Sequence, residues 1–174
     1  MLLEMDFDAY HPRIIGKLTN YDLPKTSVHQ WLAEQYGCSY EESKGITFQL
    51  LYGGIPDEFD EIPYYRGVRE FIDKLWLKST ESGYLQTQCR RIPLEWIEGN
   101  NPQKLFNYLL QATETEFNIE VMNKLKTLQL PLPILYTYDS FLFEFDETEV
   151  ETIKLVKSVL ESYGFPVKAD WGSD

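Results

Sequence analysis

The stretch Ile134-Leu-Tyr-Thr-Tyr-Asp-Ser-Phe-Leu-Phe-Glu-Phe145 is the strongest fold signal in the sequence. Apolar and aromatic residues fill two short runs on either side of Tyr138-Asp-Ser140, which is the pattern of two strands joined at a bend. Two buried strands would hold the Asp139 carboxylate rigidly at the tip of this hairpin. Asp is also a common turn residue, so a plain surface hairpin is the simpler interpretation of the stretch taken alone.

The composition is that of a globular protein with one core and room for a subdomain. Of the 174 residues, 43% are hydrophobic and 15% are aromatic, which suffices to bury a core. No run of about 18 apolar residues occurs, so no membrane span is expected, and the first residues lack the basic region of a signal peptide. Cys38 and Cys89 fit neither a metal-binding spacing nor a disulfide framework, which favours a reducing interior compartment.

The net charge of -12 argues against a protein that wraps nucleic acid by itself, because Lys and Arg carry phosphate binding. The basic residues that occur are partly clustered, at Lys44, Arg90, Arg91 and Lys104. A local basic track inside an acidic surface therefore remains compatible with the sequence. If the partner is a nucleic acid, much of the positive surface around it would belong to another chain.

Residues 2–7 are predicted to form a strand with Asp6 near its end. Pro12 favours the first turn of a helix, so residues 13–18 are expected to be helical. Capping of that helix explains Asp8, whereas Asp6 is harder to explain as a cap. On neighbouring strands of one sheet, Asp6 and Asp139 could hold two Mg²⁺ ions about 3.5–4 Å apart, the arrangement that serves phosphoryl transfer.

A helix is expected over about 40–52, where two glycines end it. Lys44, Phe48 and Tyr52 follow one another at four-residue steps, so one face carries a cation and then two rings. An amphipathic core stripe is the ordinary explanation for such spacing, but a separate stripe already supplies the core: Ile46, Leu50 and Leu51. The first face thus offers a nucleoside triphosphate a cation for its phosphates and a stacking surface for its base.

A long helix is predicted after Asn101, with Pro102 in its first turn and an end near residue 128. Its inward residues are expected to be Leu105, Tyr108, Leu109, Ala112, Ile119, Met122 and Leu125. Gln103, Asn107 and Gln111 form a neutral polar stripe at four-residue steps. Amides suit the acceptors of a DNA minor groove, although this signal is weak alone.

The remaining segments complete an α+β order. Helices are predicted over 26–36, 64–79 and 147–162, strands over 83–88 and 165–170, and a loop over the acidic residues 55–62. The inward residues of the last helix are expected to be Val150, Ile153, Val156, Val159 and Leu160. His29, Arg90 and Arg91 are as readily ordinary surface residues as functional ones. The order predicts helices on one face of an antiparallel sheet.

Taken together, the motifs resemble the palm and fingers of family A (Pol I-type) DNA polymerases. Asp6-Phe-Asp-Ala-Tyr-His-Pro-Arg13 resembles motif A, and Lys44-Gly-Ile-Thr-Phe-Gln-Leu-Leu-Tyr-Gly53 resembles motif B on the O helix. Tyr138-Asp-Ser140 resembles motif C. Three further segments are similar in the same order: 26–37, 83–94 and Asn107-x-x-x-Gln111. The resemblance covers nearly the whole chain.

The resemblance implies a set of site residues. Two Mg²⁺ ions would be held by Asp6, Asp139 and the Phe7 carbonyl, with the two aspartates as the catalytic residues. The incoming dNTP would be bound by His11, His29, Lys44, Phe48 and Tyr52, with His11 where these polymerases keep a glutamate that excludes a ribose 2′-OH. Primer-template DNA would be contacted by Arg90, Arg91, Asn107, Gln111 and Tyr138.

It also implies a domain layout and partners. Residues 1–18 would be palm, 19–82 a reduced helical fingers subdomain with motif B on the helix of about 40–52, and 83–174 palm again. The thumb, the exonuclease domain and the first palm strands are missing, so we expect one subunit of a split, phage-like polymerase or a truncated form. A second polymerase chain would supply the thumb and N-terminal palm, in the cytoplasm of a bacterium or a phage-infected cell, with no membrane partner.

Some residues depart from the family pattern. Tyr40 and Glu41 stand where arginines that bind phosphate are usual, and motif C ends in Ser140 rather than a glutamate. These changes keep two alternatives open. The chain could be a catalytically degenerate polymerase fold that serves as a structural or DNA-binding subunit, or a relative of the single-subunit RNA polymerases.

Overall fold

The computed structural model describes residues 1–146 and 148–172. The chain forms two compact units. Unit 1 joins Met1–Tyr10 to Glu114–Asp174, and unit 2 is His11–Thr113. The divisions expected from the sequence, after residues 18 and 82, lie elsewhere, and the assignment of palm and fingers stays a prediction. Residue 147, the expected first residue of the last helix, and residues 173 and 174, the end of the expected palm, lie outside the described residues.

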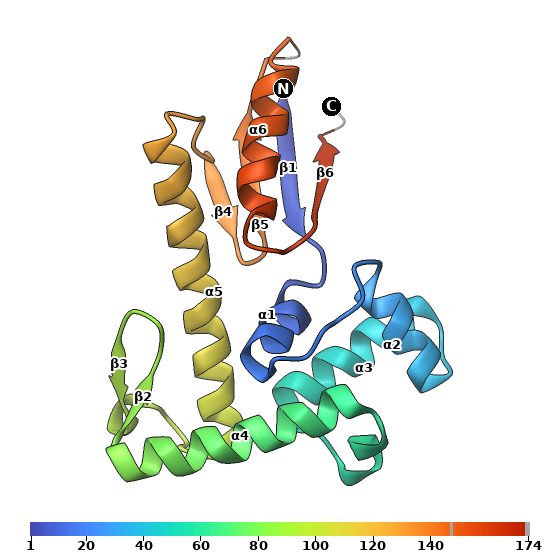
Figure 1. Ribbon diagram of the computed structural model, residues 1–174, viewed down its shortest axis with the longest axis vertical. Helices are drawn as coiled ribbons and strands as arrows, with labels where there is room; N and C mark the ends of the chain where they lie inside the picture. Colours follow the sequence, from blue (N-terminus) through green and yellow to red (C-terminus); the bar gives the residue numbers. More distant parts are fainter. Residues whose placement is uncertain (147, 173–174) are drawn as a thin grey trace. The chain divides into compact units, whose positions relative to one another are not determined.

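Unit 1 is built on a four-stranded antiparallel sheet with the order β4-β5-β1-β6 (Figure 1). The strands are β1 (Leu2–Phe7), β4 (Leu135–Thr137), β5 (Ser140–Glu144) and β6 (Val167–Trp171). β1 lies inside the sheet, so that Asp6 is opposite Ser140 of β5 on one side and Lys168 of β6 on the other. This sheet, with its helices, confirms the predicted α+β class.

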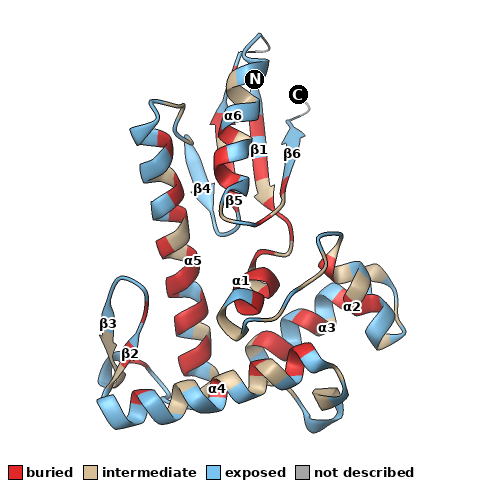
Figure 2. Cartoon of the chain, viewed as in Figure 1, coloured by how far each residue is buried: buried red, intermediate tan, exposed pale blue. Residues whose placement is uncertain are grey.

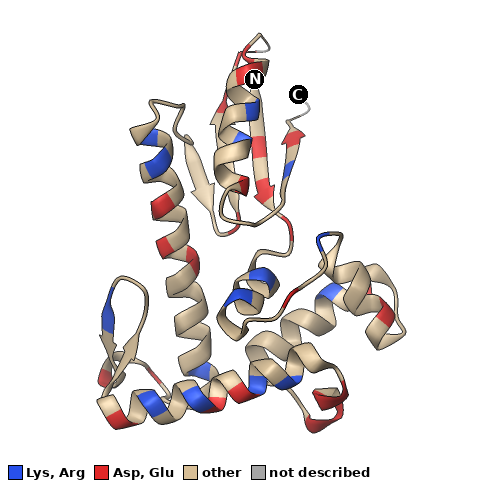
Figure 3. Cartoon of the chain, in the orientation of Figure 1, with Lys and Arg blue, Asp and Glu red and all other residues tan. Residues whose placement is uncertain are grey.

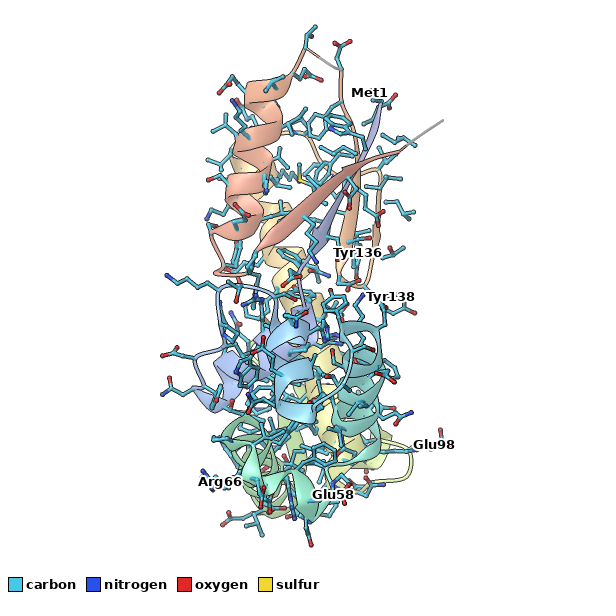
Figure 4. All side chains as sticks on the ribbon, turned by 90° about the vertical axis from the view of Figure 1, so that its right-hand side faces the viewer. Met1, Glu58, Arg66, Glu98, Tyr136 and Tyr138 are labelled. Carbon is cyan, nitrogen blue, oxygen red and sulfur yellow. The ribbon has the colours of Figure 1, made fainter. Side chains whose placement is uncertain are left out.

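The two faces of β1 differ because side chains alternate along a strand. Leu3, Met5 and Phe7 are fully buried, whereas Asp6 is only half-buried on the opposite face. The Phe7 ring stacks on Tyr10 with 4.5 Å between ring centroids. α6 (Val150–Glu161) covers one face of the sheet (Figures 1 and 4).

Two expectations for unit 1 are wrong. The last helix buries Val156, Val159 and Leu160 as predicted, but Val150 is exposed because it is the first residue of α6. The hairpin does not have two buried arms: β5 is largely buried, whereas all three residues of β4 are exposed (Figure 2). The reason is topological, since β4 is an edge strand with β5 as its neighbour.

Unit 2 is mainly helical. Its elements are most of α1 (Tyr10–Thr19), α2 (Val28–Tyr36), α3 (Tyr40–Gly53), α4 (Pro63–Ser82), β2 (Tyr84–Gln86), β3 (Arg91–Pro93) and the first half of α5 (Pro102–Thr127). The acidic loop predicted over 55–62 contains a 3-10 turn, Asp57–Glu61. A second 3-10 turn, Leu94–Trp96, follows β3.

Local capping signals set the ends of these helices, as the sequence predicts. The Ser27 hydroxyl accepts a hydrogen bond from the Gln30 amide at the start of α2, and Gly37 ends that helix at a φ of 67°, which suits glycine. Ser39 and Glu42 form a capping box at the start of α3. Asn101 immediately precedes α5, and its Oδ1 accepts a hydrogen bond from the Lys104 amide at 2.9 Å.

The buried face of α5 differs from the predicted one at two positions. Tyr108 and Ile119 are exposed, whereas Phe106 and Val121 are buried. In unit 2 the buried residues of α5 are three adjacent pairs, 105–106, 109–110 and 112–113, which places residue 108 at the outer edge of that face. In unit 1 the buried series 114, 118, 121 and 125 leaves residue 119 outside it. Among the described helices, none is long and apolar enough to cross a membrane.

Candidate functional site

The backbone of the sheet in unit 1 places the segments of the two predicted metal ligands beside each other. Asp6 is the last residue but one of β1, and Asp139 lies in the two-residue turn between β4 and β5. The Phe7 amide donates a hydrogen bond to the Asp139 carbonyl oxygen at 2.9 Å, and Asp6 is paired with Ser140. The hydroxyls of Thr137 and Ser140 meet at 3.1 Å across the base of the turn.

The electrostatics of Asp6 show that the two carboxylates interact. Burial, and next the negative charge of Asp139, raise the pKa of Asp6 from 3.8 to about 6. Both effects disfavour the ionised form. A bound cation would reverse this disadvantage, because an opposite charge favours ionised carboxylates.

A lysine that the sequence analysis did not identify lies next to this pair. Lys168 is opposite Asp6 in the sheet, and its Nζ is 2.6 Å from Oδ1 of Asp8, which is buried. Its positive charge partly lowers the pKa of Asp6, against the effects of burial and Asp139. Lys168 could not be found from sequence spacing, because only the pairing of β6 with β1 brings it to these acids.

The donor set fits a magnesium ion that takes its other ligands from water and substrate. Within residues 1–146 and 148–172, no three His, Cys, Asp or Glu side chains are grouped to hold a metal ion. Two carboxylates are nevertheless an ordinary protein contribution for Mg²⁺, which keeps several waters and binds substrate phosphates. Asp6 and Asp139 supply such a pair, and the Phe7 carbonyl stays a predicted further ligand.

In unit 2, α3 carries the predicted cation-and-ring face. Phe48 is 65% exposed and its ring lies 4.5 Å from that of Tyr52. Lys44 Nζ is 3.4 Å from Glu41 Oε1 and 4.4 Å from the centre of the Tyr40 ring. An adjacent face of α3 is buried through Ser43, Thr47, Leu50 and Leu51, while Ile46 is half-buried. The separation of a core stripe from the Lys44 face is therefore confirmed.

The end of α3 is held by the amide stripe of α5. Gln103 Nε2 donates to the Leu51 carbonyl oxygen at 2.6 Å, and Asn107 Nδ2 donates to the Tyr52 carbonyl oxygen at 3.1 Å. Carbonyls in the last turn of a helix lack donors from their own helix, and these amides supply them. The sequence suggests minor-groove contacts for Asn107 and Gln111. The structure gives Asn107 this bond to α3 and leaves Gln111 exposed.

Tyr52 has a second hydrogen-bond partner, at its hydroxyl group. Tyr52 Oη is hydrogen-bonded to Nδ1 of His11, the residue at the predicted sugar gate. The structure thus brings together two of the residues predicted to bind dNTP. A resemblance of motifs does not predict this bond, because His11 replaces the usual glutamate.

The other predicted residues of unit 2 occupy separate elements. His29 is half-buried in α2, with its ring 6.2 Å from that of Tyr40. Arg90 and Arg91 are exposed on the β2–β3 hairpin, and the Arg91 guanidinium lies 4.8 Å from the centre of the Tyr84 ring. Figure 3 shows acidic and basic residues mixed over the helices of this unit, with an acidic group at Asp57–Glu61.

The fold is that of a polymerase domain. The chain is similar to the POL domain of Pol1 from M. smegmatis, solved in complex with DNA primer-template and dNTP, with a TM-score of 0.67 over 97% of this chain. Sequence identity is 18%, so the likeness concerns the fold, and the chain spans 38% of the length of that neighbour. No protein-family model and no curated protein sequence matches the chain.

Proposed function

We propose that this chain is the catalytic palm-and-fingers part of a template-directed DNA polymerase that adds dNTPs to a primer 3′ end. The observation that carries the proposal is that Asp6, near the end of β1, lies beside the β4–β5 turn that carries Asp139, whose negative charge helps to raise the pKa of Asp6 to about 6. The polymerase fold of the chain supports it. Within this fold, the class of reaction is phosphoryl transfer to a primer hydroxyl.

Asp6 and Asp139 are the proposed holders of two Mg²⁺ ions, with the Phe7 carbonyl. Bound there, the ions would activate the primer hydroxyl and stabilise the charge on the leaving pyrophosphate. The charge of this pair depends on pH. Because the pKa of Asp6 is about 6, its carboxyl group is mostly ionised at neutral pH. Lys168 pairs with Asp8 and so offsets one further negative charge beside the pair.

Unit 2 supplies the groups proposed to bind the incoming dNTP: His11, His29, Lys44, Phe48 and Tyr52. Lys44 is partly exposed, and its contact with Glu41 is an exposed ion pair of small free energy, which a triphosphate can displace. The exposed Phe48 ring offers a surface on which a sugar or base can pack. The bond between His11 and Tyr52 fixes two of these side chains relative to each other.

Primer-template DNA is proposed to contact Arg90, Arg91, Asn107, Gln111 and Tyr138. Both arginines are exposed, as phosphate contacts require. The Tyr138 side chain is 78% exposed at the tip of the hairpin (Figure 4). Because the chain has a net charge of -12, Arg90 and Arg91 are a local basic site on an acidic protein.

A second polymerase chain is proposed to supply the thumb and the N-terminal palm, in the cytoplasm of a bacterium or a phage-infected cell. The edge strand β4 gives a place for a further strand, because residues 128–138 carry no charge and β4 is exposed. Charged edge residues are a common protection against strand pairing, and they are missing here.

Primer extension tests the proposal. The protein, purified natively with any chain bound to it, should incorporate dNTPs with Mg²⁺, and Asp6→Ala or Asp139→Ala should abolish incorporation. Glu4→Gln is the matched control, since Glu4 is an exposed carboxylate on the same face of β1. Extension that survives in either aspartate variant would refute the catalytic assignment.

One observation favours a second candidate, a degenerate polymerase fold that binds DNA without chemistry. Tyr40 and Glu41 both contact Lys44, where the resemblance leads one to expect arginines and a free phosphate-binding lysine. This candidate predicts primer-template binding that persists in Asp6→Ala, with no dNTP incorporation by the unmodified protein.

A further inference from the structure

A buried asparagine joins the two halves of the carboxylate pair in unit 1. Asn118 of α5 has no exposed surface. Its Oδ1 accepts a hydrogen bond of 2.8 Å from the Tyr10 hydroxyl, and its Nδ2 donates one of 2.8 Å to the Tyr138 carbonyl oxygen. Both ends of a single amide are therefore used, by partners from two distant parts of the sequence.

The two partners lie next to the proposed metal ligands. Tyr10 follows β1, the strand of Asp6, and its ring stacks on Phe7. Tyr138 immediately precedes Asp139 in the hairpin turn. Asn118 thus ties the segment after the first aspartate to the residue before the second.

The turn needs such an anchor. Tyr138 has a φ of 51°, a left-handed conformation that is unfavourable for a residue other than glycine. Its side chain is exposed, and so is the whole of β4, so apolar packing contributes little to holding the turn on that side. The hydrogen bond from Asn118 acts on the backbone of this strained residue itself.

The orientation of the amide is set by Tyr10. The Tyr10 side chain is buried, and its hydroxyl donates to Asn118 Oδ1 at 2.8 Å. A hydroxyl buried in this way donates to Oδ1, which directs Nδ2 towards the Tyr138 carbonyl. An apolar side chain of similar size would fill the space of Asn118 but would satisfy neither partner.

We propose that Asn118 is a positioning residue, which holds the hairpin turn so that the Asp139 carboxylate lies beside Asp6 and the pair binds a divalent ion. The metal in this inference rests on the proposed function. The positioning of the turn rests on the hydrogen bonds of Asn118. Asn118 does not touch the reacting atoms. It acts through the backbone of Tyr138, and Tyr10 acts through Asn118.

Two measurements on the whole protein test it. The first is hydrogen exchange of the Phe7 amide, which donates to the Asp139 carbonyl oxygen and so reports the seating of the turn. The second is the affinity for Mn²⁺, with Asp139→Asn as the reference that defines binding at the pair. Asn118→Leu should speed Phe7 exchange about tenfold relative to Met5 of the same strand, and weaken Mn²⁺ binding to a similar degree, since a buried polar network loses both bonds.

Matched variants separate positioning from general stability. Tyr10→Phe keeps the ring and removes the hydroxyl that orients the amide, so both effects should keep their direction and be smaller. Thr113→Val removes another buried hydrogen bond of α5, from Thr113 Oγ1 to the Leu109 carbonyl oxygen at 2.8 Å, and should leave Phe7 exchange and Mn²⁺ affinity unchanged. If Asn118→Leu does not fold, Tyr10→Phe carries the test against the same control.

The outcomes distinguish the inference from the function on which it rests. An unchanged rate of Phe7 exchange in the folded variant overturns the positioning role, whatever happens to the metal. A protein that binds no Mn²⁺ through Asp6 and Asp139 refutes the metal site, and the Phe7 amide then decides alone whether Asn118 holds the turn. Equal changes in the Thr113→Val control would overturn the proposal as well.

Discussion

The carboxylate pair of unit 1 and the α3 face of unit 2 are held in place by different means. Asp6 and Asp139 are placed by backbone pairing, because adjacent strands bring their segments together. Lys44, Phe48 and Tyr52 extend from a helix whose last turn is bound by the amides of α5. One group is therefore placed by the ladder of a sheet, with Asn118 bonded to the turn of Asp139, and the other depends on the two side chains Gln103 and Asn107.

This difference predicts how each region responds to change. A sheet ladder keeps its geometry when a side chain is replaced, so variants of the aspartates should alter chemistry with little effect on the fold. A face that depends on side-chain bonds to a helix end should lose order when one donor is removed. Variants of the aspartates in unit 1 are thus expected to change catalytic rate, whereas variants of the donors in unit 2 are expected to change the order of the α3 face.

The largest effect is expected at the carboxylate pair. Asp6→Asn and Asp139→Asn should each lower kcat for dNTP incorporation by about 10³-fold or more, because ions that supply several kcal/mol of charge stabilisation lose a ligand. The circular dichroism spectrum should stay that of the unmodified protein. Single-turnover kinetics measure the loss, and an effect confined to KM would contradict a role in chemistry.

Phe48 should show the next largest effect, and on binding. Phe48→Ala removes an exposed ring that supports little of the core, so stability should hardly change while KM for dNTP rises by about tenfold or more, as expected for a lost stacking surface. Gln49→Ala, at the adjacent exposed position, is the control. A fall in thermal stability comparable to that of a core variant would show that Phe48 serves packing rather than nucleotide binding.

The amides of α5 that bind the end of α3 test whether side-chain bonds hold the face in unit 2. Gln103→Leu and Asn107→Leu should each lower the free energy of unfolding by about 1–2 kcal/mol, because helix-end carbonyls lose their donors. Asn123→Leu, at an exposed amide further along α5, should change it little. Denaturant titrations measure these differences, and equal effects at all three positions would mean that the stripe does not brace α3.

Much of this arrangement was predictable from the sequence where the signals are local. The capping box at Ser39, the glycine after α2 and the alternation along β1 act within a few residues, and the predicted elements there are confirmed. The exposure of β4 was not predictable, because its apolar residues look like those of a buried arm. Its burial depends on which strand pairs with its outer edge, and the sequence of β4 does not contain that information.

The site shows the same limit. Asp6 and Asp139 could be paired because their motifs occur in a recognisable order. Lys168 and Asn118 could not be found, because each meets the pair only through sheet register or helix packing between distant segments. The bond between Asn107 and α3 could not be found for the same reason, because the carbonyl that accepts it lies on another helix.

The pH dependence of stability tests the like-charge pair without any substrate. The pKa of Asp6 is higher in the folded protein than its ordinary 3.8, so its contribution is full at low pH and is lost as pH rises from about 4 to above 6. Metal-free protein should therefore lose thermal stability over this range. The loss should be modest, since Asp6 is only half-buried and solvent screens it.

Variants on either side of Asp6 should change that profile in opposite directions. Asp139→Asn removes the neighbouring negative charge and should flatten the pH profile, while Lys168→Met removes a positive charge and should steepen it. Differential scanning calorimetry at a series of pH values between 4 and 8 measures the slopes. Identical slopes in the unmodified protein and Asp139→Asn would show that the charge of Asp139 does not raise the pKa of Asp6.

The smallest effect is expected where unit 2 is proposed to contact the sugar of the nucleotide. His11 and Tyr52 share a hydrogen bond, so His11→Ala and Tyr52→Phe should each weaken the preference for dNTP over rNTP, by about fivefold, as expected for the loss of one ordering contact. Because both variants break the same bond, the double variant should add little to the larger single effect. Additive losses would mean that the two side chains act separately on the nucleotide. A preference for rNTP in the unmodified protein would instead favour the RNA polymerase alternative, with His11 as a gate that admits the 2′-OH.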